Sequence, residues 1–432
     1  MTTASIAQPV GGGRWFAWPA IMMIASMATL VRAYVVVKLF FLALFLLAAI
    51  VNVVFSRTRI IVYRRLVWFY VGIGMAGLVW ALVGVLHPAN YIQGDLEALR
   101  LYVVWSVAFV VLYTLLRAEQ SLHIMHSAMV VAGILIPLIN FVGLYDQLSG
   151  LGFISEGIRQ ELNMEIGFGH GYFQFSSENI QVMFLIAPYL LSLQFRTGAG
   201  KSNSLLTKLA LMLSLILVVI SGRRALWLVV ALTPCTVLLL SSITGSYRLM
   251  KAGGRRFLLA CAAAGVIALS TLLIAPESTS DFSAVSRISQ AFSSEDERTI
   301  QSPYLIRAFM ESPILGSGFG GYAGYQRNEE KPWAYELTYQ KLLFNMGIVG
   351  AAFLLALFFL YLVLVIRLLR RFQCASAIPF GLLVAFCSLL LGAYSNPYFS
   401  GFDSLFFLGL LPFLSTFKRG FDGSKSIVGA AV

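Results

Sequence analysis

The stretch that decides the fold runs from Met346 to Ile366 and reads MGIVGAAFLLALFFLYLVLVI, an unbroken apolar run. About 20 apolar residues in one helix cross the ~30 Å hydrocarbon core of a bilayer. Comparable runs recur at 33–55, 99–116, 206–220 and 257–275. The sequence therefore predicts an all-α polytopic membrane protein.

Composition supports this reading, because 59% of the 432 residues are hydrophobic and only 12% are charged. A soluble domain has about 45–50% apolar and about 25% charged residues. We expect about 12 transmembrane helices, at 15–31, 33–55, 64–87, 99–117, 124–146, 179–195, 205–221, 225–242, 257–275, 337–366, 378–396 and 403–417. The four cysteines lie in apolar runs or in expected cytoplasmic segments, so no disulfide and no metal site is predicted.

The net charge of +12 is explained by topology rather than by nucleic-acid binding. If both termini are cytoplasmic, every cytoplasmic connection carries at least one basic residue. Of the 19 acidic residues, only Glu119 and Asp422 lie on that side. This asymmetry follows the positive-inside rule. A role in binding nucleic acid is therefore excluded.

The chain is expected to form a single integral membrane domain, residues 1–432, with its working face outside. Three outer segments are too long for simple connectors, namely 87–97 and two extracytoplasmic loops, the first at 147–178 and the second at 277–336, and loops of such length usually carry function. We expect short helices in the second loop, for example at 304–310. We detect neither an internal repeat nor clusters of charge at mid-membrane, and we expect Lys38 to snorkel to the surface.

Two adjacent arginines stand on the outer face, in the turn Ser221-Gly222-Arg223-Arg224-Ala225 between two helices. The free N–H groups at a helix N-terminus favour an anion, and planar guanidinium groups bind phosphate oxygens in pairs. Arg223 and Arg224 therefore predict a phosphate site. The alternative is that they bind lipid headgroups or pair with acidic loop residues.

The second loop adds further basic residues, including Arg287, Arg298 and Arg307. A short helix with Arg307 stops at Pro313 and leads into the glycine-rich sequence GSGFGG, which can approach a ligand with its backbone. Arg307 and Arg287 are candidate phosphate ligands. The alternative for Arg307 is an ion pair with Glu311 one helical turn away.

A carboxylate follows this loop, at the expected outer end of the helix that contains Met346–Ile366. Glu336, Tyr339 and Gln340 are spaced i, i+3 and i+4, so we expect them to share one helix face. Glu336 beside a phosphate site is a candidate general base for a sugar hydroxyl, and Tyr339 and Gln340 are candidate sugar ligands. The alternative is that Glu336 only favours the helix N-terminus.

The first loop ends in GFGHGYFQFSSEN, residues 167–179, in which aromatic, amide, hydroxyl and imidazole groups alternate. Such side chains can stack on sugars and hydrogen-bond to them. His170, Tyr172 and Gln174 are therefore candidate sugar ligands. A lone histidine among glycines is more often structural, and this alternative stays open for His170.

These elements, in this order, resemble the superfamily of O-antigen ligases and Wzy-type polysaccharide polymerases. The resemblance rests on the SGRRA turn, the R-x8-G-x-G pattern from Arg307 to Gly318, and the following helix with its Gly-x-x-Gly at Gly347 and Gly350. The segment before Asn179 resembles the family's polar motif ahead of a helix. The resemblance implies a GT-C-like membrane glycosyltransferase whose arginines hold the diphosphate of a lipid-linked glycan, with inversion and without metal or other cofactors.

One position departs from the ligases, which carry a histidine eleven residues before the first glycine of the Gly-x-x-Gly. Here that position is Glu336. The departure favours a polymerase of the bacterial inner membrane, with Glu336, Arg223 and Arg307 as catalytic residues and undecaprenyl diphosphate-linked oligosaccharide as substrate. The expected partners are membrane lipids and the flippase and chain-length regulator of the same pathway. The alternatives are a ligase to another acceptor and a flippase or exporter of lipid-linked oligosaccharide.

Overall fold

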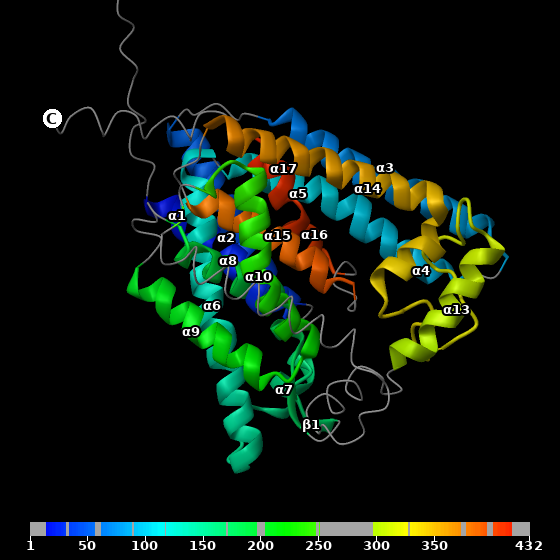
Figure 1. Ribbon diagram of the computed structural model, residues 1–432, viewed down its shortest axis with the longest axis horizontal. Helices are drawn as coiled ribbons and strands as arrows, with labels where there is room; N and C mark the ends of the chain where they lie inside the picture. The colour runs from blue at the N-terminus through cyan, green and yellow to red at the C-terminus, as the bar shows by residue number, and fades with distance from the viewer. Residues whose placement is uncertain are drawn as a thin grey trace, which may run out of the picture.

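The computed structural model describes residues 14–31, 34–56, 62–88, 90–116, 118–169, 172–196, 204–247, 250, 297–326, 329–372, 377–394 and 401–416. Its elements, labelled as in Figure 1, are the helices α1 (Arg14–Thr29), α2 (Val35–Ser56), α3 (Arg64–Leu86), α4 (Ile92–Leu99), α5 (Trp105–Leu115), α6 (Ala118–Ser149), α7 (Glu156–Leu162), α8 (Met183–Gln194), α9 (Leu205–Ile220), α10 (Arg224–Ile243), α13 (Glu297–Glu311), α14 (Thr338–Phe372), α15 (Ala377–Gly392), α16 (Phe402–Leu408) and α17 (Leu410–Leu414), the strands β1 (Glu165–Gly169) and β2 (Tyr172–Ser176), a π-helical segment η1 (Arg100–Val104) and a 3-10 helix η2 (Glu178–Val182).

Six helical spans in the described part of the chain are long and apolar enough to cross a membrane, namely Val35–Val54, Arg64–Leu86, Ile92–Leu115, Ser121–Ser149, Arg224–Ile243 and Thr338–Arg371. Four shorter apolar helices accompany them, namely Phe16–Thr29, Leu205–Ile220, Ala377–Gly392 and Asp403–Leu414. The expected segment 257–275 lies outside the described residues, and each of the others overlaps a helix. A polytopic, mostly helical membrane protein is therefore confirmed, whereas the number twelve stays a prediction.

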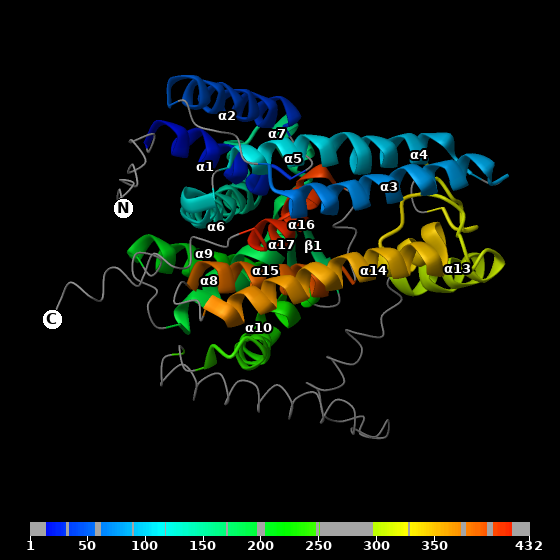
Figure 2. The same ribbon diagram turned by 90° about the horizontal axis from the view of Figure 1, so that it is seen from above.

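The centre of the bundle is formed by α8 and α15, which are buried along nearly their whole lengths and pack against each other. Both helices carry apolar residues on every face, as is typical of helices inside a bundle. By contrast, α2 lies at the edge of the bundle in Figure 2, and Val36 and Phe40 on it are 79% and 58% exposed. Such a surface suits contact with lipid.

The loop at 147–178 contains elements that the sequence did not predict. Helix α7 is followed by an antiparallel hairpin, in which Gly167 of β1 pairs with Gln174 of β2. Asp146, buried at the end of α6, accepts a hydrogen bond from Arg159 of α7 at 2.6 Å and backbone N–H bonds from Phe153 and Ile154. The loop is thereby fixed to the end of the bundle.

Helix α14 is broken at Gly347, where φ is 61° and ψ is −171°. The segment Pro313–Gly318, here called the wedge, inserts at this break. The N–H groups of Ser317 and Gly318 donate to the carbonyls of Phe344 and Asn345, and those of Ile348 and Val349 donate to the carbonyls of Pro313 and Ile314. The break therefore separates a short first segment, 338–346, from the remainder of the helix.

The expectation that Lys38 snorkels to the surface is wrong. Its side chain is 2% exposed and lies 3.1 Å from the carboxylate of Asp403, which is 1% exposed. Burial of a lysine within a membrane protein is favourable only when a partner compensates its charge. This buried ion pair joins the peripheral helix α2 to α16.

Candidate functional site

The arginine turn has the local geometry that the sequence predicts. Helix α9 ends at Ile220, Gly222 adopts a φ of +63°, and α10 begins at Arg224 with Arg223 in the N-cap position. A positive φ at this point is readily accessible only to glycine among the common residues. The glycine thus turns the chain so that both arginines stand at the N-terminus of α10.

Arg223 connects this turn to the end of the hairpin. Its Nη2 donates to the hydroxyl of Ser176 at 2.8 Å and to the carbonyl of Ser177 at 3.3 Å. Arg223 and Arg224 are both half-buried. The structure therefore brings the first loop and the arginine turn together, although they are about 45 residues apart in the sequence.

A buried polar cluster lies directly beside this contact. The Nδ2 of Asn140 donates to the Oδ1 of Asn179 at 2.8 Å, and the hydroxyl of Ser177 lies 2.5 Å and 2.7 Å from the Oδ1 atoms of Asn140 and Asn179. The Nδ2 of Asn179 is buried and has no hydrogen-bond partner among the described residues. Sequence analysis missed Asn140, for which a single amide inside an apolar stretch of α6 was the only signal.

Glu336 lies just before α14 and contacts α13. Its Oε2 accepts from the Nε of Arg298 at 2.9 Å, and its backbone N–H donates to the Oε1 of Gln301 at 3.0 Å. The Nε2 of Gln340 donates to the hydroxyl of Ser302 at 3.0 Å. Glu336 and Gln340 therefore face the same helix, α13.

Tyr339 does not share this face, so the expected grouping of three residues is wrong. Its hydroxyl donates to the carbonyl of Leu390 at the end of α15, and its ring lies 6.3 Å from that of Tyr394. Glu336 precedes α14, which begins at Thr338, so its spacing to Tyr339 does not place the two on one helix face. Tyr339 and Gln340 are adjacent within the helix and point about 100° apart around it.

Arg307 lies on a different side of α13 from Arg298. The two residues are nine positions apart, which at ~100° per residue places them on opposite faces of a helix. Arg307 is 86% exposed, and its Nε lies 4.0 Å from Glu311, the alternative pairing considered above. The structure thus brings Arg298, to which the sequence gave no role, against Glu336.

The glycine-rich turn does not present its backbone to an open site. A Cβ on Gly316 would overlap α14 at Asn345, and a Cβ on Gly318 would overlap Gly84 of α3. These glycines allow the close approach of protein backbone. The prediction that they approach a ligand is wrong for these two positions.

Tyr335, the residue before Glu336, is buried, and its phenol oxygen accepts the N–H of Ala323 at 2.8 Å. Burial raises the pKa of Tyr335 to about 12. The phenol therefore stays neutral at ordinary pH. Glu336 is the ionisable group of this pair that can accept a proton.

Three of the predicted ligands lie wholly or partly outside the described residues. Arg287 and His170 lie outside the described residues. Tyr172 is described only as the first residue of β2, without its side chain. Gln174 is half-buried in the same strand.

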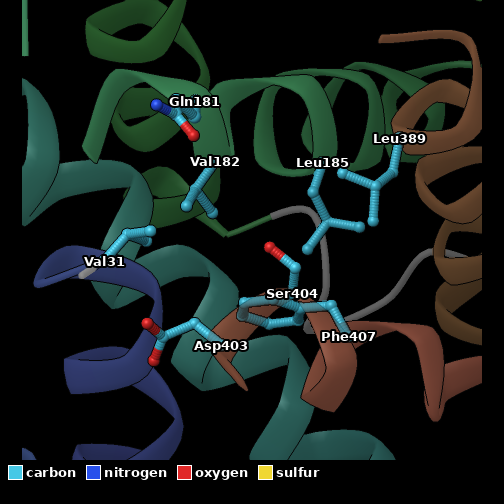
Figure 3. Close-up of a pocket in the computed structure, with 8 residues that line it drawn as sticks. All are labelled: Val31, Gln181, Val182, Leu185, Leu389, Asp403, Ser404 and Phe407. Carbon is cyan, nitrogen blue, oxygen red and sulfur yellow. The ribbon is translucent and has the colours of Figure 1, made fainter. Parts of the chain in front are cut away.

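Figure 3 shows a pocket whose lining residues come from η2, α8, α15 and α16, together with Val31. It is lined by Val31, Gln181, Val182, Leu185, Leu389, Asp403, Ser404 and Phe407. Gln181 follows the polar cluster in η2, and Leu389 precedes the residue whose carbonyl binds Tyr339. Figure 3 shows Ser404 and Phe407 on α16 facing Leu185 of α8 across the pocket. Asp403 belongs both to this wall and to the ion pair with Lys38.

Neither Arg223 nor Glu336 lines this pocket, and no described contact joins the two residues directly. Of the residues that the structure describes, no three histidine, cysteine, aspartate or glutamate side chains gather as metal ligands. The arrangement offers guanidinium groups, a carboxylate and buried amides. Such groups can bind an anion and can accept a proton from a hydroxyl.

Residues 209–355 match the family model described as O-antigen ligase. The matched range contains the arginine turn, α13 and the wedge, Glu336 and the break in α14. No curated protein matches the chain. The match supports a place for this membrane protein in the superfamily of O-antigen ligases and polymerases, whose members transfer glycans.

Proposed function

We propose that the chain is a polysaccharide polymerase of the bacterial inner membrane. It transfers a glycan from an undecaprenyl diphosphate-linked donor to a sugar hydroxyl of a lipid-linked acceptor, on the periplasmic face. Support comes from the family match over residues 209–355, together with a carboxylate at position 336, where the resembling ligases carry histidine.

The observation that carries this proposal is the setting of Glu336. Its carboxylate is 17% exposed and is oriented by the Nε of Arg298 at 2.9 Å. A positioned carboxylate of this kind can accept a proton from an attacking hydroxyl. A carboxylate that serves only to complement a helix dipole would not need a guanidinium partner from a second helix.

In the proposed reaction, the acceptor hydroxyl attacks the anomeric carbon of the donor sugar. The new bond joins this oxygen to the anomeric carbon, while the bond between that carbon and the phosphate oxygen breaks. Its electron pair leaves with the undecaprenyl diphosphate, and the hydroxyl proton moves to Glu336. Attack from the face opposite the leaving group inverts the anomeric configuration.

Charge accumulates on the leaving diphosphate, and the arginines supply the opposite charge. Arg223 and Arg224 stand at the N-terminus of α10, where backbone N–H groups add to their effect. Arg307 is exposed on the face of α13 opposite Arg298 and remains a second phosphate ligand in this proposal, as does Arg287. Stabilising charge as it develops is a major contribution to enzymatic rate.

Among the proposed sugar ligands, Gln340 has the strongest support. Its Oε1 is buried and has no hydrogen-bond partner among the described residues, so it can accept from a sugar hydroxyl. The hydroxyl of Tyr339 is engaged by Leu390, which supports a structural role for that residue. Gln174, Tyr172 and His170 in the first loop complete the proposed set.

The ligase and exporter alternatives lead to different observations. A ligase would transfer the finished glycan to an acceptor outside the pathway of chain growth, and the same residues would serve it. An exporter would need ionisable groups along a path through the bundle. Lys38 and Asp403 are the buried ion pair that an exporter could use, whereas the contacts of Arg223 and Glu336 lie where α10 and α14 begin, and these two residues are the ones that favour an enzyme.

The test is chain growth by the purified protein with lipid-linked repeat units. Glu336→Gln keeps the shape of the side chain but cannot take the proton, so we expect turnover to fall ~10²–10⁴-fold. Glu329→Gln is the matched control, since it changes an exposed carboxylate of the same loop that the proposal does not use, and it should retain normal turnover. Arg223→Lys keeps the charge but loses the planar fork, and it should weaken donor binding nearly as much as Arg223→Ala.

Near-normal turnover of Glu336→Gln would remove the proposed base. Loss of turnover in a correctly folded His170→Ala variant would move the base to the first loop. Transfer to a foreign acceptor without chain growth would identify a ligase. Transport of lipid-linked oligosaccharide across vesicles without any new glycosidic bond would identify an exporter.

A further inference from the structure

Asp95 of α4 has a buried carboxylate that binds the turn at Phe319 and Gly320, directly after the wedge. Its Oδ1 accepts the backbone N–H groups of Phe319 at 3.0 Å and Gly320 at 3.1 Å. Its second oxygen accepts from the side-chain amide of Asn90. The residue is 1% exposed, and no basic side chain pairs with it in the described part of the chain. Hydrogen bonds, two of them from a glycine-rich turn, therefore stabilise this carboxylate.

The turn is pressed so closely against α3 and α4 that side chains are excluded there. A Cβ on Gly94 would come within 2.6 Å of the Cα of Gly320, and a Cβ on Gly84 would overlap the carboxylate of Asp95 itself. The N–H of Tyr91 donates to the carbonyl of Gly320 at 2.9 Å. The carboxylate thus holds the turn at one defined place on the two helices.

The wedge, which directly precedes this turn, also hydrogen-bonds to the first part of α14. The N–H groups of Ser317 and Gly318 occupy the carbonyls of Phe344 and Asn345, so the wedge fixes where the helix breaks. The indole of Trp80 on α3 donates to the carbonyl of Leu315 in the wedge at 2.8 Å. Helices from the first quarter of the chain therefore fix the segment 338–346 through the wedge.

We propose that Asp95 is a positioning residue for the transfer reaction. Resting on the proposed function, this inference assigns Asp95 the task of holding the wedge, which orients the start of α14 and with it Glu336 and Gln340. Asp95 itself touches neither substrate nor base. A shift of about 1 Å in a catalytic group, caused by a remote substitution, can lower the rate ~10²-fold.

The first test uses Asp95→Ala in the full-length protein, reconstituted in lipid. We expect kcat per folded molecule to fall by up to ~10²-fold, while KM for the lipid-linked donor changes by less than about twofold, because the arginines are untouched. The matched control is Glu97→Ala, which removes an exposed carboxylate from the same helix, one that pairs with Lys331. It should leave kcat unchanged.

The second test reads the position of the wedge without any catalysis. Ser317 is 3% exposed, so a thiol introduced by Ser317→Cys, with the four native cysteines replaced, should be protected from a maleimide reagent. Adding Asp95→Ala should make this thiol reactive. A fall in kcat with the thiol still protected would overturn the proposal, as would unchanged kcat with the thiol exposed.

A third variant keeps the proposal testable if Asp95→Ala fails to fold. Asp95→Asn leaves an oxygen for the two backbone N–H groups but turns an amide donor toward the amide of Asn90. Adding Asn90→Asp restores a donor and an acceptor in exchanged positions. The double variant should recover kcat lost by Asp95→Asn, and an absence of recovery would contradict the proposal. Failure of the proposed function would be seen separately, as normal turnover of Glu336→Gln.

Discussion

Gly347 provides a quantitative test of the wedge. Its backbone has a φ of 61° and a ψ of −171°, a conformation that costs other residues of order 1–3 kcal/mol. A Cβ at this position would also overlap the carbonyl oxygen of Ile314, and such overpacking typically costs another ~1–3 kcal/mol. Gly347→Ala should therefore destabilise the protein by roughly 2–6 kcal/mol.

The matched control is Gly157→Ala in α7, where an added Cβ meets nothing within 4 Å and the backbone conformation suits alanine. That substitution should be neutral or stabilise by ~0.4–1 kcal/mol. The assay is the fraction of purified protein that stays monodisperse by size-exclusion chromatography after heating in detergent. Equal heat resistance of the two variants would refute the wedge as described, because it would mean that the chain at Gly347 has room for a side chain.

Two further predictions concern ion pairs. Lys38→Met should lower the yield of folded protein, since it removes the lysine of a buried ion pair, a change that typically costs ~3–5 kcal/mol, whereas Lys38→Met combined with Asp403→Leu should recover most of the yield. Equal yields of the single and double variants would show that the pair is not buried together. Arg298→Ala should slow chain growth about fivefold, because a charge-assisted bond in a partly exposed pair contributes ~1 kcal/mol, and it should have no additional effect in a Glu336→Gln background. Independent, multiplying effects in the purified assay would mean that Arg298 acts on the substrate rather than through Glu336.

Much of the helical architecture was predictable, because the length and apolar character of a segment determine whether it can cross a membrane. The start of α10 at Arg224 was also predictable, since Gly222 and the two arginines end one apolar run and begin another. Both signals are local. They depend on neighbouring residues and on the surrounding lipid, not on distant parts of the chain.

The partners of the functional side chains were not predictable, because they come from distant segments. Glu336 meets Arg298 only after the loop between α13 and α14 folds back. Lys38 meets Asp403, which is 365 residues away. In both cases a sequence offers several arginines or acids, and only the packing of helices decides between them.

The sequence does not distinguish a glycine that contacts a ligand from one that contacts another helix. A glycine that lets backbone approach a ligand and one that lets backbone approach another helix have the same lack of a side chain. Gly316 and Gly318 are of the second kind. The buried amide of Asn140 was overlooked for a related reason, since its partner Asn179 lies on another helical element.

The break in α14 at Gly347 interrupts the backbone hydrogen bonds of an apolar helix. A helix interrupted in hydrocarbon normally leaves carbonyl and N–H groups without partners, at a cost of several kcal/mol for each group. Here two donors and two acceptors of the wedge replace, one for one, the bonds that the helix gives up. The wedge therefore pairs with α14 in one fixed register. A single-residue insertion or deletion between Pro313 and Gly318 would misalign all four bonds at once, so this short stretch is constrained in length as well as in sequence.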